Sequence, residues 1–139
     1  NLIIRPHWIT DPPVFSSERI SCVTHDEEPD LHQLFKQADI LVTDYSSAYI
    51  DWLILDRPVI FSPYDLQNYT LKNGLLEDYT ELVPSPICHT STELFSSLSE
   101  ALENPSTHAI QRELMKQKYL GDLGGNACER ILEIMTQEP

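Results

Sequence analysis

The sequence at residues 38–47, ADILVTDYSS, decides the fold. Its apolar run has the length of one buried strand, which we expect over residues 39–43. Polar residues follow, and the apolar-rich segment at residues 46–55 indicates a helix. The next apolar run, at residues 58–62, predicts another strand. A strand that passes into a helix and then into a further strand is the repeating unit of a parallel sheet.

The same alternation continues on both sides of this stretch. Residues 2–5 and 20–23 have strand-like sequences, and a capping-box pattern at Thr90 and Glu93 predicts the start of a helix. Residues 63–80 are rich in Tyr, Asp and Asn, and we expect a long loop with one helical turn. The chain is therefore predicted to be an α/β protein, with a Rossmann-like parallel sheet and helices on both faces. The other predicted elements are a short strand at residues 82–83 and helices at residues 30–38 (with Asp30 as N-cap), 90–102, 109–119 and after Gly124-Gly125.

The composition limits the partners of this chain. Its 139 residues are enough for one domain, with predicted boundaries at residues 1 and 139. Asp and Glu number 22 against 9 Lys and Arg, and the formal charge of -13 repels nucleic acid and anionic lipid. We therefore expect no nucleic-acid partner and no binding of anions by bulk charge.

Several features favour a cytoplasmic location. No uncharged apolar stretch approaches the ~18 residues of a membrane span, and the first residues lack the regions of a signal peptide. Cys22, Cys88 and Cys128 are odd in number and far apart, which argues against a disulfide framework and fits a reducing compartment. The chain starts in a strand-like segment without an initiator Met, and we interpret it as part of a longer protein.

Two strand ends carry side chains suited to binding phosphate. In open parallel sheets, ligands bind beyond the carboxyl ends of the strands. Arg5 and His7 directly follow the first predicted strand and supply a guanidinium and an imidazole. Thr43 ends the third predicted strand, and Ser46 and Ser47 begin the following helix, where backbone N–H groups and two hydroxyls can bind a diphosphate. The alternative is that one serine is only an N-cap, worth about 1 kcal/mol.

Several nucleotide-binding and metal-binding patterns are missing from the sequence. It has no Walker loop, no Gly-rich dinucleotide fingerprint and no Gly-x-Ser-x-Gly elbow. Cys22, His25 and His32 only loosely resemble a metal spacing, and no second Cys pair completes a zinc set. The Asp-x-Asp pair with which metal-dependent sugar transferases hold a nucleotide diphosphate is also absent. We therefore predict no metal, and expect backbone amides and basic side chains to hold any diphosphate.

Ordered motifs along nearly the whole chain resemble one known family. Residues 38–47, followed by Ile50-Asp51-Trp52 and Arg57-Pro58, resemble the signature of the CDP-glycerol glycerophosphotransferases. These are the teichoic acid polymerases and primases and related capsule enzymes. The further matches, in chain order, are Arg5-Pro6-His7 for Arg-x-His, Tyr64-Asp65-Leu66 with Tyr69 for Tyr-Asp-Leu-x-x-Tyr, Pro84-Ser85-Pro86 for Pro-Gly-Pro, Glu93-Leu94 for Glu-Leu, and Gly125 with Arg130 for a C-terminal Gly and Arg.

The resemblance implies the C-terminal, donor-nucleotide-binding domain of a two-domain GT-B transferase. Members of the family transfer a polyol phosphate from CDP-glycerol or another CDP-polyol to a lipid-linked acceptor, without a metal. They do so in teichoic acid or capsule synthesis at the inner face of the plasma membrane, which implies a cytoplasmic, peripheral full-length protein. The family's Trp-His-Gly-Thr-Pro-Leu-Lys run, to which the general base is assigned, belongs to the other domain and is absent from this sequence. We therefore expect this chain alone to be inactive.

The resemblance also assigns site residues. His7 and Asp44 fall on family positions associated with donor phosphate binding and activity, and they are the predicted catalytic residues. Two departures bear on the match, because Ser85 replaces the middle Gly of Pro-Gly-Pro and Gly124 stands where an Asp usually precedes the Gly. The predicted donor-binding residues are Arg5, Thr43, Ser46, Ser47, Glu93 and Arg130.

The residues leave three other interpretations open. The same fold serves other nucleotide-sugar enzymes, such as polysaccharide transferases and sugar epimerases. Asp44 at a strand end also fits a phospho-receiver domain, although Arg5-Pro6-His7 stands where that class needs an acidic pair and Pro84 where it needs a Lys. A half whose main task is docking a partner domain would expose apolar side chains at the strand ends.

Overall fold

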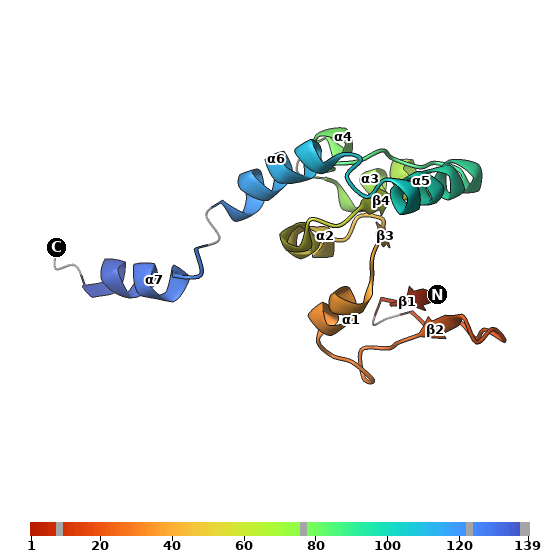
Figure 1. Cartoon of the computed structure of the whole chain (residues 1–139), viewed down its shortest axis with the longest axis horizontal. Coiled ribbons are helices and arrows are strands. Elements are labelled where there is room, and N and C mark those ends of the chain that lie inside the picture. The colour runs from red at the N-terminus through yellow and green to blue at the C-terminus, as the bar shows by residue number, and fades with distance from the viewer. Residues whose placement is uncertain (8–9, 76–77, 122–123, 137–139) are drawn as a thin grey trace. The chain divides into compact units, whose positions relative to one another are not determined.

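The chain divides into two compact units, Asn1–Ile40 and Leu41–Pro139, and each is described by itself. The computed structural model describes residues 1–7, 10–75, 78–121 and 124–136. Figure 1 shows the order of the elements from the N-terminus in red to the C-terminus in blue. The predicted single domain over residues 1–139 stays a prediction.

The first unit holds one parallel strand pair and one helix. Strands β1 (Leu2–Ile4) and β2 (Ile20–Cys22) pair in parallel, with Leu2 opposite Ile20. Helix α1 (Leu31–Gln37) starts where the side chain of Asp30 accepts the backbone N–H of His32 at 2.9 Å. The two predicted strands and the predicted helix with its cap are confirmed.

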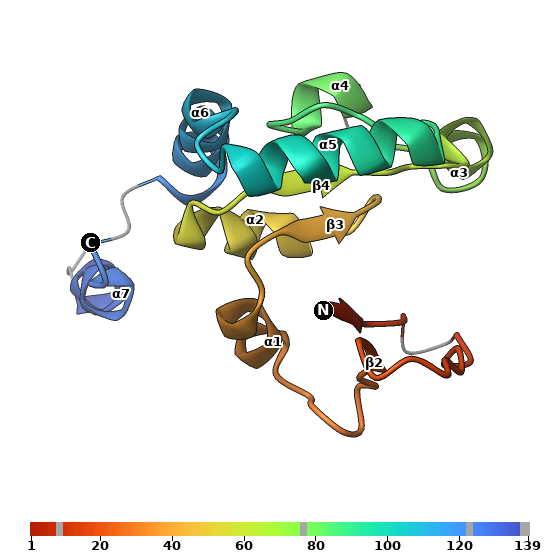
Figure 2. The ribbon, with the colours of Figure 1, turned by 45° about the vertical axis from the view of Figure 1, so that its right-hand side comes forward.

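The second unit is built around the predicted strand–helix–strand segment. Strands β3 (Leu41–Thr43) and β4 (Val59–Phe61) pair in parallel, and helix α2 (Ala48–Trp52) with the 3-10 turn η1 (Leu53–Leu55) connects them. Phe61 makes a further parallel bridge to Ile87. All three residues of β4 are buried, and since successive side chains of a strand point to opposite faces, both faces of β4 are covered. Helix α2 contacts β3, and helix α5 (Ser91–Glu103) contacts β4 (Figure 2).

Aromatic side chains fill the core of the second unit. Trp52 and Phe61 are both fully buried. The indole N–H of Trp52 donates to the carbonyls of Arg57 and Pro58, at 3.0 and 3.1 Å. The ring of Tyr49 packs edge-to-face on Phe61, with centroids 5.1 Å apart. The apolar helix predicted from residues 46–55 therefore forms the core of this unit.

Two predictions between β4 and α5 are wrong. The expected loop at residues 63–80 contains two helices, α3 (Leu66–Asn73) and α4 (Tyr79–Leu82). The expected strand at residues 82–83 is absent, because Leu82 ends α4 and the parallel pairing occurs at Ile87 instead. Helix α3 has few apolar residues and none of its side chains is buried, so it lacks the hydrophobic periodicity that marks a helix in sequence. The start of α4 is set by the side chain of Asp78, which accepts the N–H of Thr80 at 2.8 Å.

The three C-terminal helices match their predicted positions. They are α5, α6 (Ala109–Leu120) and α7 (Ala127–Thr136). The capping box predicted at Thr90 and Glu93 is present at the start of α5. No helix in the described part of the chain is both long enough and apolar enough to cross a membrane.

An arginine holds α6 to the end of η1. Arg112 is only 3% exposed, and its guanidinium donates to the Oδ1 of Asp56 at 3.2 Å and to the Asp56 carbonyl at 3.4 Å. It also donates to the carbonyls of Pro105 and Thr107, at 3.2 and 2.7 Å. A buried guanidinium is costly unless its donors are satisfied, and here one side chain joins α6 to two loops.

Candidate functional site

Three segments of the second unit meet at one edge of its sheet. They are residues 44–47 after β3, residues 62–68 after β4, and residues 88–90 after the bridge at Ile87. Because these strands run in parallel, their carboxyl ends lie at the same edge. This is the edge at which open parallel sheets bind ligands, so its side chains form the candidate site.

The last residue of β3 and the turn after it carry four of the predicted site residues. The carbonyl of Thr43 accepts the N–H of Ser62 at 2.8 Å, which fixes the end of β3 against β4. The carboxylate of Asp44 accepts the N–H of Tyr45 at 2.7 Å. The Oγ of Ser46 accepts the N–H of Ala48 at 3.2 Å, so the capping role considered for one serine is observed for Ser46.

The two serines of this turn are still able to serve a ligand. Both are exposed. The hydroxyl of Ser46 uses its oxygen to accept from Ala48, so its O–H is left as a donor. Ser47 precedes α2 and makes no side-chain capping bond. Two consecutive residues just after the carboxyl end of β3 therefore carry hydroxyl groups that can donate.

Tyrosines hold this turn in place from two other segments. The hydroxyl of Tyr45 donates to the Oδ1 of Asp65 at 2.7 Å, and its ring stacks on Tyr69 with centroids 3.8 Å apart and planes 11° apart. The hydroxyl of Tyr79, in α4, donates to the backbone carbonyl of Asp44 at 2.5 Å. The turn is thus tied to the start of α3 and to α4.

The hydroxyls of Tyr45 and Tyr79 remain protonated, and so remain hydrogen-bond donors, at neutral pH. Burial raises the pKa of Tyr45, and its bond to the carboxylate of Asp65 raises it further. Burial also raises the pKa of Tyr79, and the nearby charge of Asp44 adds to the effect. Because both pKa values are above the ordinary phenol value of 10.0, the two tyrosines keep their hydrogen bonds over the physiological range.

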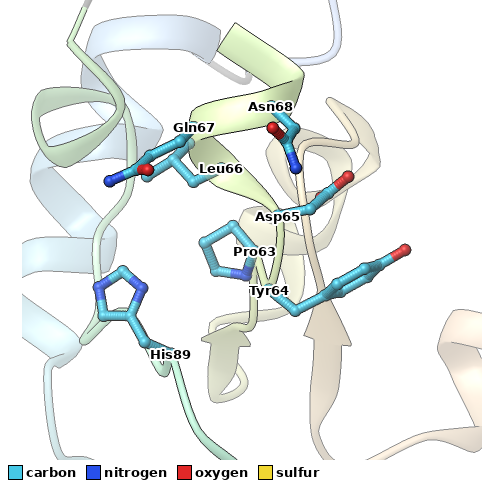
Figure 3. Close-up of a pocket in the computed structure, with 7 residues that line it drawn as sticks. All are labelled: Pro63, Tyr64, Asp65, Leu66, Gln67, Asn68 and His89. Atoms are coloured by element: carbon cyan, nitrogen blue, oxygen red, sulfur yellow. The ribbon is translucent and has the colours of Figure 1, made fainter.

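An open pocket of about 320 Å³ lies at the end of β4. The loop after β4 and the first turns of α3 form most of its lining, and His89 comes from the segment before α5 (Figure 3). In Figure 3, Gln67 and His89 lie on one side of the turn at Pro63, and Asp65 and Asn68 lie on the other. The lining residues are Pro63, Tyr64, Asp65, Leu66, Gln67, Asn68 and His89.

Glu93, a predicted donor-binding residue, caps α5. Its Oε2 accepts the backbone N–H of His89 at 2.6 Å and that of Thr90 at 3.1 Å. These two hydrogen bonds lower the pKa of Glu93, and the bond from His89 has the larger effect. The carboxylate therefore fixes the backbone of His89 beside the pocket, and a direct role in donor binding stays a prediction.

The remaining predicted site residues lie on other parts of the chain. Arg5, in the first unit, donates to the carbonyls of Val23 and Thr24 at 3.2 and 2.5 Å and bonds the Nδ1 of His25 at 3.2 Å. Its guanidinium thus ties the end of β1 to the segment after β2. His7 is exposed in the same unit, and Arg130 is exposed on α7. The structure places Asp44, Ser46 and Ser47 in the turn after β3 and Thr43 at the end of that strand, with Glu93 at the same edge of the sheet.

Sequence reasoning missed the side chains that support this turn. Asp65 and Tyr69 belong to the match with Tyr-Asp-Leu-x-x-Tyr, which is the sequence signal for them. Tyr45 lies inside the stretch at residues 38–47, but its role depends on contacts with Asp65 and Tyr69, which are distant in sequence. Tyr79 and His89 have no local signal, because their roles depend on contacts with Asp44 and with the loop after β4.

The sequence is similar to a known family and to several of its characterised members. Residues 1–137 match the family described as CDP-Glycerol:Poly(glycerophosphate) glycerophosphotransferase. The chain is 40% identical over 105 residues to the teichoic acid glycerol-phosphate primase of Bacillus subtilis (strain 168), covering 76% of this chain and 26% of that protein. It is 31% identical over 133 residues to the teichoic acid glycerol-phosphate transferase of Staphylococcus aureus (strain NCTC 8325 / PS 47), covering 95% of this chain and 34% of that protein. The chain thus spans about a third or less of the length of these relatives.

The fold is also that of a solved relative. The wall teichoic acid polymerase TagF, a GT-B-like protein, superposes with a TM-score of 0.66 at 26% identity, over 83% of this chain and 28% of that chain. A TagF variant soaked with CDPG for 30 minutes gives a TM-score of 0.63 at 27% identity, over 83% and 29% of the two chains. The fold and the sequence lead to the same assignment. The chain belongs to the CDP-glycerol:poly(glycerophosphate) glycerophosphotransferase family.

Proposed function

We propose that this chain binds the diphosphate of CDP-glycerol, or of a similar CDP-polyol, at the turn after β3. In the full-length protein it is the donor-binding part of a transferase that moves polyol phosphate to a lipid-linked acceptor in teichoic acid or capsule synthesis. The observation that carries the proposal is the pairing of Ser46 and Ser47 at the carboxyl end of β3 in a chain of this family. The family description supplies the donor, CDP-glycerol.

Because the chain is negatively charged overall, diphosphate binding depends on local contacts. A formal charge of -13 repels a diphosphate at long range. Binding therefore depends on donors that meet the phosphate oxygens directly, because hydrogen bonds to a charged group are worth about 1.5 to 3 kcal/mol each. The hydroxyls of Ser46 and Ser47 are such donors. A part for Arg5 and His7, which belong to the first unit, stays a prediction.

The carboxylate of Asp44 would repel a phosphate group bound next to it, because two like charges placed together repel each other. It accepts the N–H of Tyr45. We infer that Asp44 acts by holding the turn, so that the two serines keep their positions. Its role as a catalytic residue is a separate part of the proposal.

The proposed reaction is a phosphoryl transfer. A hydroxyl of the acceptor attacks the β-phosphorus of the donor, a new P–O bond forms, and the bond from that phosphorus to the bridging oxygen breaks. The electron pair and negative charge pass to CMP, and the proton of the attacking hydroxyl passes to a general base. The family's general-base motif is absent from these 139 residues, so this chain alone should bind the donor without turning it over.

Stabilisation of the leaving group falls to the donors at the sheet edge. Charge develops on the departing phosphate as the bond breaks, and hydrogen-bond donors fixed in advance lower the barrier. The ties from Tyr45 to Asp65 and from Tyr79 to Asp44 hold the turn before any ligand is present. No metal is required by this scheme, and the full-length protein is expected at the cytoplasmic face of the membrane.

Calorimetric titration of this chain tests the donor class. CDP-glycerol and CDP should bind, and UDP and GDP should bind more weakly. Ser47→Ala should weaken CDP binding about ten- to hundredfold, since it removes a hydroxyl donor to a charged phosphate. Ser96→Ala, at an exposed position on α5, is the matched control. Preferred binding of UDP or GDP would favour another nucleotide-sugar enzyme of the same fold.

A further inference from the structure

We propose that the Asn73-Gly74 pair at the end of α3 is a modification site, at which Asn73 deamidates to aspartate and isoaspartate in the folded chain. Asn73 is the last residue of α3, and Gly74 is its C-cap. The pair is separate from the turn after β3, and its chemistry does not depend on the proposed function.

The reaction needs only the asparagine, the next backbone nitrogen and water. The nitrogen of Gly74 attacks the side-chain carbonyl carbon of Asn73, and a new C–N bond closes a cyclic imide. The bond to the side-chain nitrogen breaks, and this nitrogen leaves as ammonia with the proton that Gly74 gave up. Water then opens the imide at either of its two carbonyl carbons, which gives aspartate or isoaspartate.

Glycine favours this attack, because a side chain on the attacking residue hinders closure of the ring. Gly74 has no Cβ, and apart from its chain neighbours no heavy atom of the described residues lies within 4 Å of the position that a Cβ would take. Asn73 and Gly74 are both exposed, so water has access to them. Among the five asparagines of the sequence, only Asn73 precedes a glycine.

One hydrogen bond restrains the attacking nitrogen. The N–H of Gly74 donates to the carbonyl of Thr70 at 3.0 Å and so closes the last turn of α3. While this bond is made, the nitrogen is held in the helical geometry and its proton is shared with Thr70. The last turn of α3 must therefore open before the imide can form.

The end of α3 has little to keep it closed. No side chain of α3 is buried, and that of Leu71 in its last turn is 86% exposed. Segments with few buried apolar contacts open locally at a lower free energy than the core does. We therefore expect the fold to slow the reaction at Asn73 without preventing it.

Asn68 gives a comparison within the same helix. It is exposed, and the N–H of the following residue, Tyr69, donates to the carbonyl of Asp65 at 2.9 Å. The two attacking nitrogens are thus held by similar bonds. Tyr69 carries a bulky side chain that stacks on Tyr45, whereas Gly74 carries none. Asn68 should therefore react much more slowly than Asn73.

The product places a negative charge at the unfavourable end of α3. The C-terminus of a helix carries a partial negative charge, which basic residues stabilise and acidic residues destabilise. Lys72 supplies the favourable charge in the last turn, and a carboxylate at position 73 opposes it. Isoaspartate also adds a carbon atom to the main chain, which interrupts the helical repeat. Deamidation should thus destabilise the helix that carries Tyr69.

Peptide mass spectrometry of the chain during incubation at mildly alkaline pH tests the proposal, with fragmentation to assign each conversion to one asparagine. In the folded chain, Asn73 should convert first among the five asparagines. It should convert about two- to tenfold more slowly than in guanidinium chloride, the factor expected for one backbone hydrogen bond. If Asn73 converts no faster than Asn68 in the folded chain, or converts only in denaturant, the proposal is overturned. A rate that denaturant leaves unchanged would contradict control by the last turn of α3.

Two variants test the consequence for α3. Asn73→Asp carries the charge of the product, and Asn73→Gln is the neutral matched variant, whose longer side chain would need a larger ring. Hydrogen exchange of the Tyr69 amide should be about two- to fivefold faster in Asn73→Asp than in Asn73→Gln, the effect of one charge at a helix end. Equal exchange rates in the two variants would contradict the proposed loss of stability in α3.

Discussion

The hydroxyl of Tyr45 donates to the Oδ1 of Asp65 at 2.7 Å and so joins the turn after β3 to the loop after β4. The two residues are 20 positions apart in the chain. Tyr45 directly precedes the two serines that we assign to the donor phosphates, and Asp65 lines the pocket at the end of β4. The stacked ring of Tyr69 supports Tyr45 from α3.

Tyr45→Phe should loosen the turn without disturbing the core. It removes the hydrogen bond to Asp65 and keeps the stack on Tyr69, so we expect a loss of about 1 kcal/mol in the free energy of unfolding. CDP binding should weaken as well, because Ser46 follows directly. Urea unfolding and calorimetric titration measure the two effects.

Tyr69→Phe is the matched control, since it keeps the stacked ring and no hydrogen bond of the Tyr69 hydroxyl occurs within the described residues. Asp65→Asn should cost less than Asp65→Ala, because the carboxamide oxygen still accepts from Tyr45. Unchanged stability and CDP affinity in Tyr45→Phe would mean that this bond does not hold the turn.

Tyr79→Phe should also weaken the site. The side chain is buried at 6% exposure, and its hydroxyl is the donor to the Asp44 carbonyl. Loss of that donor should lower the free energy of unfolding by about 1 to 2 kcal/mol and alter the amide signals of Asp44 and Tyr45. Tyr64→Phe, at a side chain 82% exposed, should leave stability unchanged. Equal effects of the two variants would contradict the proposed tie.

Glu93 makes the stability of the chain depend on pH in the acid range. Its pKa is lowered from the ordinary 4.5 by hydrogen bonds from the backbone of His89 and Thr90. A carboxyl with a lower pKa in the folded state stabilises the fold above its unfolded pKa, and this contribution is lost as the pH falls through the folded value. The glutamine of Glu93→Gln cannot ionise. The difference in free energy of unfolding between the wild type and Glu93→Gln should therefore become smaller as the pH falls below the ordinary Glu pKa of 4.5.

Urea unfolding of the two proteins between about pH 6 and pH 3 tests this expectation. Glutamine retains an acceptor oxygen for the two N–H groups, so the capping geometry is kept. A stability difference that stays constant over the whole range would show that the Glu93 carboxylate is not selectively stabilised in the folded chain.

Arg112→Lys should destabilise the second unit strongly. A lysine cannot reach the carbonyls of Asp56, Pro105 and Thr107 together, and the unsatisfied buried groups should cost on the order of 3 kcal/mol. Asp56→Asn is the matched control. The side chain of Asp56 is 60% exposed and its φ is 49°, a conformation that Asn tolerates well, so its effect should be small. Thermal unfolding compares the stability of the two variants. A larger loss of stability in Asp56→Asn than in Arg112→Lys would contradict the structural role assigned to Arg112.

The strands and the capped helices were predictable because their signals are local. The apolar run before Thr43 marks β3, and the spacing of Thr90 and Glu93 marks the start of α5. Helix α3 was not predictable in this way, because it buries no side chain and so has no apolar stripe. Its place depends on the loop after β4 and on the stack between Tyr45 and Tyr69.

The candidate site was predictable only in part. The turn with Asp44, Ser46 and Ser47 follows from the rule that ligands bind beyond the carboxyl ends of parallel strands. The hydrogen bond from Tyr79 to Asp44 joins residues 35 positions apart, so the local sequence around either residue does not predict it. The structural role of Arg5 on the carbonyls after β2 is likewise set by strand pairing, and its predicted part in donor binding is still to be tested.

Amide NMR of the isotope-labelled chain during a CDP titration tests the central claim most directly. We predict that the amides of Ser46 and Ser47 shift progressively at millimolar CDP and that Ser47→Ala reduces the affinity about ten- to hundredfold, the effect of one hydrogen bond to a charged group. Ser96→Ala should bind as the wild type does. Unmoved amides of Ser46 and Ser47 at saturating CDP, or binding that Ser47→Ala does not weaken, would contradict the assignment of this turn to the donor phosphates.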